Sequence, residues 1–96
     1  MDNNIKAYHD AAEMLKALAH PVRLCIVKGL LEKKECNVTY MQECLDLPQS
    51  TISQHLQKLR TLGIVVAERQ GLEVNYRIKN PKIEQLITIL LEEELS

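Results

Sequence analysis

The chain has 96 residues and a formal net charge of −1, and hydrophobic residues make up 46% of it. Because it contains no Phe or Trp, its core must be largely aliphatic, and a chain of this length is expected to form one small domain, residues 1–96. No apolar run approaches the roughly 18 residues of a membrane span and no signal peptide opens the sequence, so we expect a cytosolic protein without membrane contact.

The first predicted helix covers residues 5–18. Its apolar residues are spaced three or four apart, as helical periodicity requires, at Ile5, Tyr8, Ala12 and Leu15. An alanine-rich face allows another helix to approach closely, either in the same protomer or across a dimer.

A second helix is predicted to begin at Pro21, because proline is tolerated in a first helical turn and disfavours helix in the residue before it. It should run to about Leu31. Its predicted inward face carries Val22, Cys25, Ile26, Gly29 and Leu30.

A short third helix should follow, with Asn37 or Thr39 as its N-cap and its end near Asp46. The few residues before the next helix match a helix-turn-helix connection. The fourth helix is expected between Pro48, which suits a helix start, and Gly63, which suits a helix stop. Its apolar stripe consists of Ile52, Leu56, Leu59 and Leu62.

The polar face of this fourth helix carries hydroxyls, amides and a lysine but no carboxylate. This composition is expected of a helix that approaches phosphates and base edges. The alternative is an ordinary amphipathic helix with a polar outer face, and this stretch alone does not decide between the two.

A β-hairpin is predicted after Gly63. Residues 64–69 are rich in β-branched residues, Gln70-Gly71 is a turn pair, and residues 72–78 alternate apolar with polar. A basic hairpin directly after a helix-turn-helix would be a wing, with its tip at residues 69–73.

Asn80 and Pro81 are predicted to cap and begin a fifth helix. Its apolar stripe is wider than one small core needs, which indicates a two-fold dimer interface made by the first and last helices. The predicted interface residues are Ile5, Tyr8, Ala12, Leu15, Ile83, Leu86, Ile87 and Leu90. The predicted fold is mainly α (α+β): a winged helix-turn-helix of five helices, with a two-stranded hairpin between the fourth and the fifth.

Charge is distributed unevenly along the chain. Residues 48–79 contain five basic and two acidic side chains, whereas the remainder contains seven basic and eleven acidic ones. A basic segment inside an acidic chain is typical of an electrostatic contact surface confined to one face.

In this order of elements, the chain resembles the ArsR/SmtB family of winged-helix bacterial repressors, and in particular its PagR-type members. The matching segments are residues 18–27, 37–39, 47–56, 63–65, 69–73 and 80–82. The resemblance implies a homodimer that represses transcription by occupying a roughly palindromic operator in double-stranded DNA. It also implies that Gln49, Ser50, Ser53 and Gln54 enter the major groove.

The sequence departs from the family at its sensor sites. Where many relatives have a metal-binding Cys-x-Cys pair, this chain has Asn37 and Thr39, and residues 80–96 contain no His or Asp. Because these ligands are missing, we predict no metal and no cofactor. The spacing of Cys25, Cys36 and Cys44 also predicts neither a disulfide framework nor structural zinc.

A thiol switch is a further possibility. Cys36 follows two lysines, which could lower its pKa, so it is the candidate redox residue. An inert thiol is the alternative. Cys25 and Cys44 are predicted to be core residues.

The leading hypothesis is therefore a dimeric, sequence-specific DNA-binding repressor. The residues expected to neutralise or contact phosphates are Thr51, His55, Lys58, Arg60, Arg69, Gln70 and Arg77. His55 could instead flank the core, and Arg23 is expected to have a structural role. Rival hypotheses are a winged helix used only for protein contact and a thiol- or metal-responsive repressor. An enzyme is not expected, because the known catalytic motifs are absent and the domain is too small to enclose much of a pocket.

Overall fold

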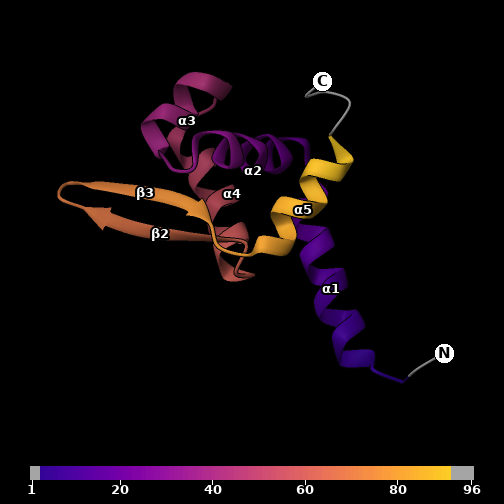
Figure 1. Cartoon of the computed structure of the whole chain (residues 1–96). Coiled ribbons are helices and arrows are strands. Elements are labelled where there is room, and N and C mark those ends of the chain that lie inside the picture. Colours follow the sequence, from indigo (N-terminus) through magenta and orange to yellow (C-terminus); the bar gives the residue numbers. More distant parts are fainter. Residues whose placement is uncertain (1–2, 92–96) are drawn as a thin grey trace.

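The computed structural model describes residues 3–91 and shows a helical body from which a β-hairpin projects (Figure 1). The elements are α1 (Ile5–Leu18), α2 (Pro21–Lys33), β1 (Cys36–Asn37), α3 (Val38–Leu45), α4 (Gln49–Thr61), β2 (Val65–Gln70), β3 (Glu73–Ile78) and α5 (Pro81–Leu90). The molecule measures 48 × 31 × 22 Å along its principal axes. Within residues 3–91, no helix has the length and apolar character needed to cross a membrane.

Side chains before three of the helices fix where those helices begin. The side-chain oxygens of Asn37 and Asn80 accept hydrogen bonds from the backbone N–H groups of Tyr40 (2.8 Å) and Lys82 (2.9 Å). His20 caps α2 through Nδ1, which accepts from the N–H of Val22 at 3.1 Å. Each bond satisfies a donor that the first helical turn cannot pair internally. The predicted starts of α2 and α5 are therefore confirmed, and of the two candidate caps for α3 the structure uses Asn37 and not Thr39.

The hairpin belongs to a three-stranded antiparallel sheet of order β1-β3-β2. In β1, Cys36 pairs with Tyr76 and Asn37 with Asn75, so the predicted two-stranded sheet lacked one strand. The turn also differs from the prediction. Gln70 pairs with Glu73, which leaves Gly71 and Leu72 as the two turn residues, and Gly71 takes a φ of 67° that favours glycine.

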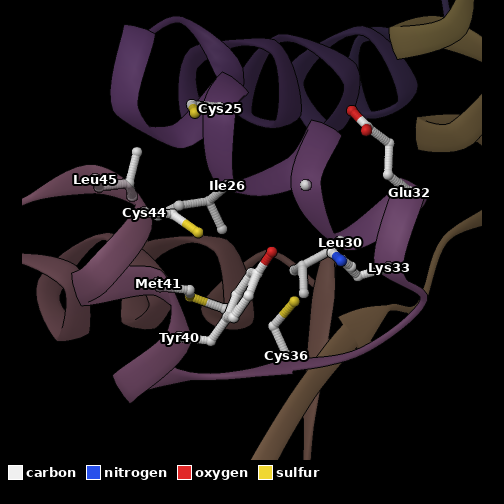
Figure 2. A pocket seen from close by; sticks show the side chains of 11 residues that line it. Cys25, Ile26, Leu30, Glu32, Lys33, Cys36, Tyr40, Met41, Cys44 and Leu45 are labelled. Atoms are coloured by element: carbon white, nitrogen blue, oxygen red, sulfur yellow. The ribbon is translucent and has the colours of Figure 1, made fainter.

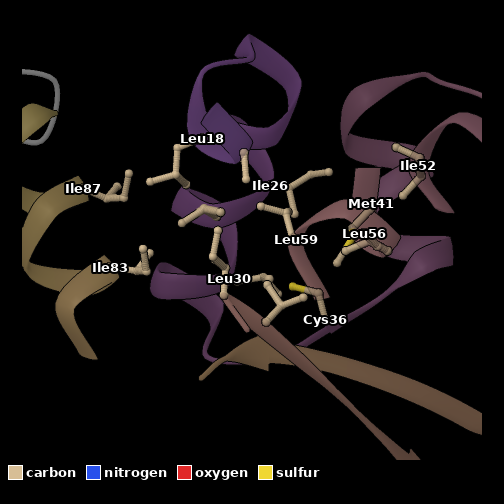
Figure 3. Close-up of a cluster of buried hydrophobic side chains, with 14 residues drawn as sticks. Leu18, Ile26, Leu30, Cys36, Met41, Ile52, Leu56, Leu59, Ile83 and Ile87 are labelled. Atoms are coloured by element: carbon tan, nitrogen blue, oxygen red, sulfur yellow. The ribbon is translucent and has the colours of Figure 1, made fainter. Parts of the chain in front are cut away.

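The core is a cluster of aliphatic side chains between the helices and the base of the sheet (Figure 3). From α4 it takes Ile52, Leu56 and Leu59, which confirms the predicted stripe. The inward face of α2 is rotated from the prediction. Ile26, Val27 and Leu30 are the residues of α2 that are buried in the core. Cys25, which was predicted to face inward, is exposed.

Two further predictions about buried residues are wrong. Cys44, predicted to be a core residue, is exposed, because Met41 is the residue of α3 that is buried in the core. Cys36 is the buried cysteine, since β1 pairs with β3. On α5, Ile83 and Ile87 were assigned to the dimer interface, but they are 0% and 1% exposed in the protomer's own core. They therefore have no surface left to offer a partner.

Candidate nucleic-acid interface

Helices α3 and α4 are joined by a short, sharply turned connection. Asp46 ends α3 in the left-handed conformation with a φ of 54°, and α4 begins three residues later at Gln49. Pro48 stands at the N-cap of α4 and its side chain makes no capping hydrogen bond. The first backbone N–H groups of α4 therefore remain available to an acceptor outside the helix.

The polar side of α4 faces outward. The four predicted base-reading residues lie in its amino-terminal half, and all are exposed: Gln49, Ser50, Ser53 and Gln54. Lys58 and Arg60 are exposed further along, whereas Thr51 and His55 are partly buried. Because α4 contains no carboxylate, its outward face offers hydrogen-bonding groups and positive charge together.

His55 contacts the start of α2. Its ring centroid lies 4.5 Å from that of His20, and its Nδ1 atom lies 3.4 Å from Nη1 of Arg23. Burial, His20 and Arg23, in that order, lower the pKa of His55 below its ordinary value of 6.5. Arg23 also donates through Nε to the carbonyl oxygen of Ala17, which confirms its structural role. His55 thus flanks the core, and its contact with phosphate stays a prediction.

On the wing, the predicted phosphate-contacting residues differ in their surroundings. Arg69 is exposed near the tip. Arg77 donates through Nε to Oε1 of Glu68 at 2.7 Å, so a neighbouring carboxylate partly neutralises it. Gln70 accepts a hydrogen bond from the side-chain amide of Asn75 at 3.0 Å. Arg69 is therefore the better placed of the two arginines to meet an external anion.

Leu72 lies in the turn between Gly71 and Glu73 and is 99% exposed. The sequence places it within the predicted tip, residues 69–73, but also at the start of the alternating segment 72–78. It therefore did not single out Leu72 as an exposed apolar residue.

Exposed apolar residues also lie on α1 and α5, outside the polar face of α4. Ile5, Tyr8 and Leu15 of α1 are each more than half exposed, and Leu90 of α5 is 61% exposed. Ala12 lies exposed on the same helix, and Leu86 is partly buried against the core. This is the surface that the predicted homodimer would cover.

The candidate redox residue has a different environment from the one expected. Burial, more than any other influence, raises the pKa of the Cys36 thiol, and the nearby lysine Lys33 opposes this only in part. Lys33 lowers the pKa of Cys36 as expected, but burial outweighs it, so the expected net lowering is wrong. The redox role itself stays a prediction. Among residues 3–91, no three His, Cys, Asp or Glu side chains gather as a metal would require.

The sequence matches known regulators. Residues 18–67 match the family model described as a helix-turn-helix domain. The transcriptional repressor PagR of Bacillus anthracis is 52% identical over 81 residues, which cover 84% of this chain and 81% of that protein. The HTH-type transcriptional repressor SmtB of Mycobacterium tuberculosis is 42% identical over 77 residues, which cover 80% of this chain and 56% of SmtB.

Solved structures show the same fold. The crystal structure of PagR superposes with a TM-score of 0.83 at 48% identity, over 91% of this chain and 99% of that one. A homodimeric winged helix-turn-helix DNA-binding domain from Mycobacterium bovis, described as a possible ArsR-family regulator, has a TM-score of 0.84 at 29% identity. That match covers 98% of this chain and 86% of the other.

Proposed function

Because this chain belongs to the ArsR/SmtB family of winged helix-turn-helix transcriptional repressors, we propose that it is a homodimeric repressor that occupies a specific operator in double-stranded DNA. Such a protein would act in the cytoplasm and would carry no catalytic activity. A two-fold dimer would favour a roughly palindromic operator, with half-sites about 34–36 Å apart or a multiple of that.

The observation that carries this proposal is the outward face of α4. Its amino-terminal half exposes two glutamines and two serines without a carboxylate, on a helix held firmly by Ile52, Leu56 and Leu59. Amides and hydroxyls can pair with base edges in the major groove, which is wide enough to admit a helix.

The proposed contacts divide into two groups. Gln49, Ser50, Ser53 and Gln54 would read bases. The groups that would bind phosphates are Thr51, Lys58, Arg60, Arg69 and Gln70, with His55 and Arg77 contributing less because other residues already engage them.

A substitution at Gln54 tests the base-reading assignment. The operator is first identified by sequencing the DNA fragments that the purified protein retains. We then expect Gln54→Ala to weaken operator binding by about 1–3 kcal/mol and to relax the preference at one base position. Binding to a set of operators with single base changes measures both effects.

Gln85→Ala is the matched control. It removes the same side chain from an exposed position on α5, outside α4, and should leave affinity and base preference unchanged. Equal losses in the two variants would contradict the base-reading role of Gln54. A protein that uses its winged helix only for protein contact would show no salt-dependent shift of any DNA fragment.

A further inference from the structure

A cavity of about 140 Å³ lies between α2 and α3, away from the polar face of α4 (Figure 2). Its walls are mainly apolar. They include Ile26, Gly29 and Leu30 from α2, Cys36 from β1, and Met41 and Cys44 from α3. Glu32, Lys33 and Tyr40 complete the lining at the side that is open to solvent. Among residues 3–91, no buried side-chain nitrogen or oxygen lacks a hydrogen-bond partner, so the inner wall presents no unsatisfied polar atom.

Gly29 keeps this space open at a cost to the helix. It lies inside α2 and does not have a positive φ, so its backbone conformation does not require glycine. Glycine in a helix interior is less favourable than alanine. A methyl group added at Gly29 would meet no heavy atom within 4 Å. Alanine would therefore fit at this position and stabilise α2. The effect of glycine here is to leave the cavity larger by the volume of a side chain.

The chemistry of the walls favours an aromatic occupant. Figure 2 shows the sulfur atoms of Cys36 and Cys44 turned toward the same space, with Tyr40 beside them. Sulfur makes favourable contacts with aromatic rings. An enclosed apolar protein cavity of about 150 Å³ holds one benzene molecule, so the volume of this partly open cavity suits one aromatic ring.

We propose that the cavity between α2 and α3 is a binding site for a small, mostly apolar molecule of about the size of one aromatic ring. The occupant would contact Met41 and Cys44 of α3, the helix that packs against α4. This inference does not depend on DNA binding, and its test uses no DNA.

The test uses toluene as the probe and the full chain. A titration followed by methyl NMR should show saturable shifts at Ile26, Leu30 and Met41. Gly29→Met, which adds a flexible, helix-compatible side chain, should fill the cavity and weaken toluene binding at least tenfold. Amide NMR dispersion confirms that this variant is folded.

Two companion variants complete the experiment. Gly29→Ala adds one methyl group, so it should raise the melting temperature and weaken toluene binding by a smaller factor. Gln85→Met adds the same side chain on the exposed side of α5 and should bind toluene as the unmodified chain does. The inference is overturned if the unmodified chain shows no saturable shifts, if the shifts lie only on the exposed face of α1, or if Gly29→Met binds toluene as tightly as the unmodified chain.

Discussion

His55 shows how one residue of the recognition helix can serve the fold. It lies on the side of α4 that meets α2, where its ring contacts His20 and Arg23. Partial burial, together with the neighbouring His20 and Arg23, disfavours the protonated form of the His55 ring. The contact therefore holds α4 against α2 best when His55 is neutral.

Stability should consequently depend on pH. Because the folded pKa of His55 lies below the ordinary value of 6.5, the unfolded chain binds more protons than the folded one just below pH 6.5. We expect the free energy of unfolding contributed by His55 to be fully present above pH 6.5. It should fall as the pH drops from 6.5 through the lower folded pKa.

Urea denaturation at a series of pH values measures this dependence, and His55→Gln should flatten it in that window. A side-chain NMR titration gives the folded pKa of His55 directly. A folded value at or above 6.5 would contradict the prediction.

At the scale of elements, the wing combines a fixed base with an exposed tip. Its base is anchored because β3 pairs with both β1 and β2, while the two-residue turn carries the tip away from the core. Arg69 lies near that tip, and no acidic side chain pairs with it in residues 3–91. A cationic side chain held on paired strands, as Arg69 is, suits a contact with a DNA phosphate. Such a contact does not distinguish one base sequence from another.

Arg69→Ala should therefore weaken binding to all sequences alike. Loss of one phosphate contact should reduce the slope of log K against log salt by about 1. Mobility-shift titrations at several salt concentrations measure that slope. Lys82→Ala, which removes a positive charge from the start of α5, should leave it unchanged. A changed base preference with an unchanged slope would show that the wing does not act in this way.

At the scale of the whole molecule, the apolar surface of α1 needs a partner. Ile5, Tyr8 and Leu15 lie on one helical face and are 72%, 54% and 55% exposed. Exposed apolar side chains that share one helical face are expected at an interaction surface. Two-fold pairing through α1 and Leu90 of α5 would cover them and place two copies of α4 in one assembly.

Leu15→Glu should weaken the dimer at least tenfold, because a carboxylate would be buried at an apolar interface without a partner. Since Leu15 is exposed in the protomer, the variant should still fold. Sedimentation equilibrium measures the dimerisation constant. Leu72→Glu places the same charge at the wing tip and should remain dimeric, so equal dissociation of the two variants would exclude the proposed interface.

The sequence by itself determined the order of helices and hairpin, and the polar face of α4. Apolar spacing at Ile52, Leu56 and Leu59 fixes which side of that helix is buried, and the capping asparagines Asn37 and Asn80 fix where helices begin. These signals are local, so they can be recognised without knowing what the helix packs against.

The tertiary structure alone decided which apolar residues meet the protomer's own core and which remain for a partner. Ile83 and Leu90 share a periodic pattern, yet one is 0% and the other 61% exposed. Periodicity assigns residues to a common face but not to a neighbour. The burial of Cys36 and the cavity beside Gly29 were likewise hidden, because both arise where α2, α3 and the sheet meet across gaps in the sequence.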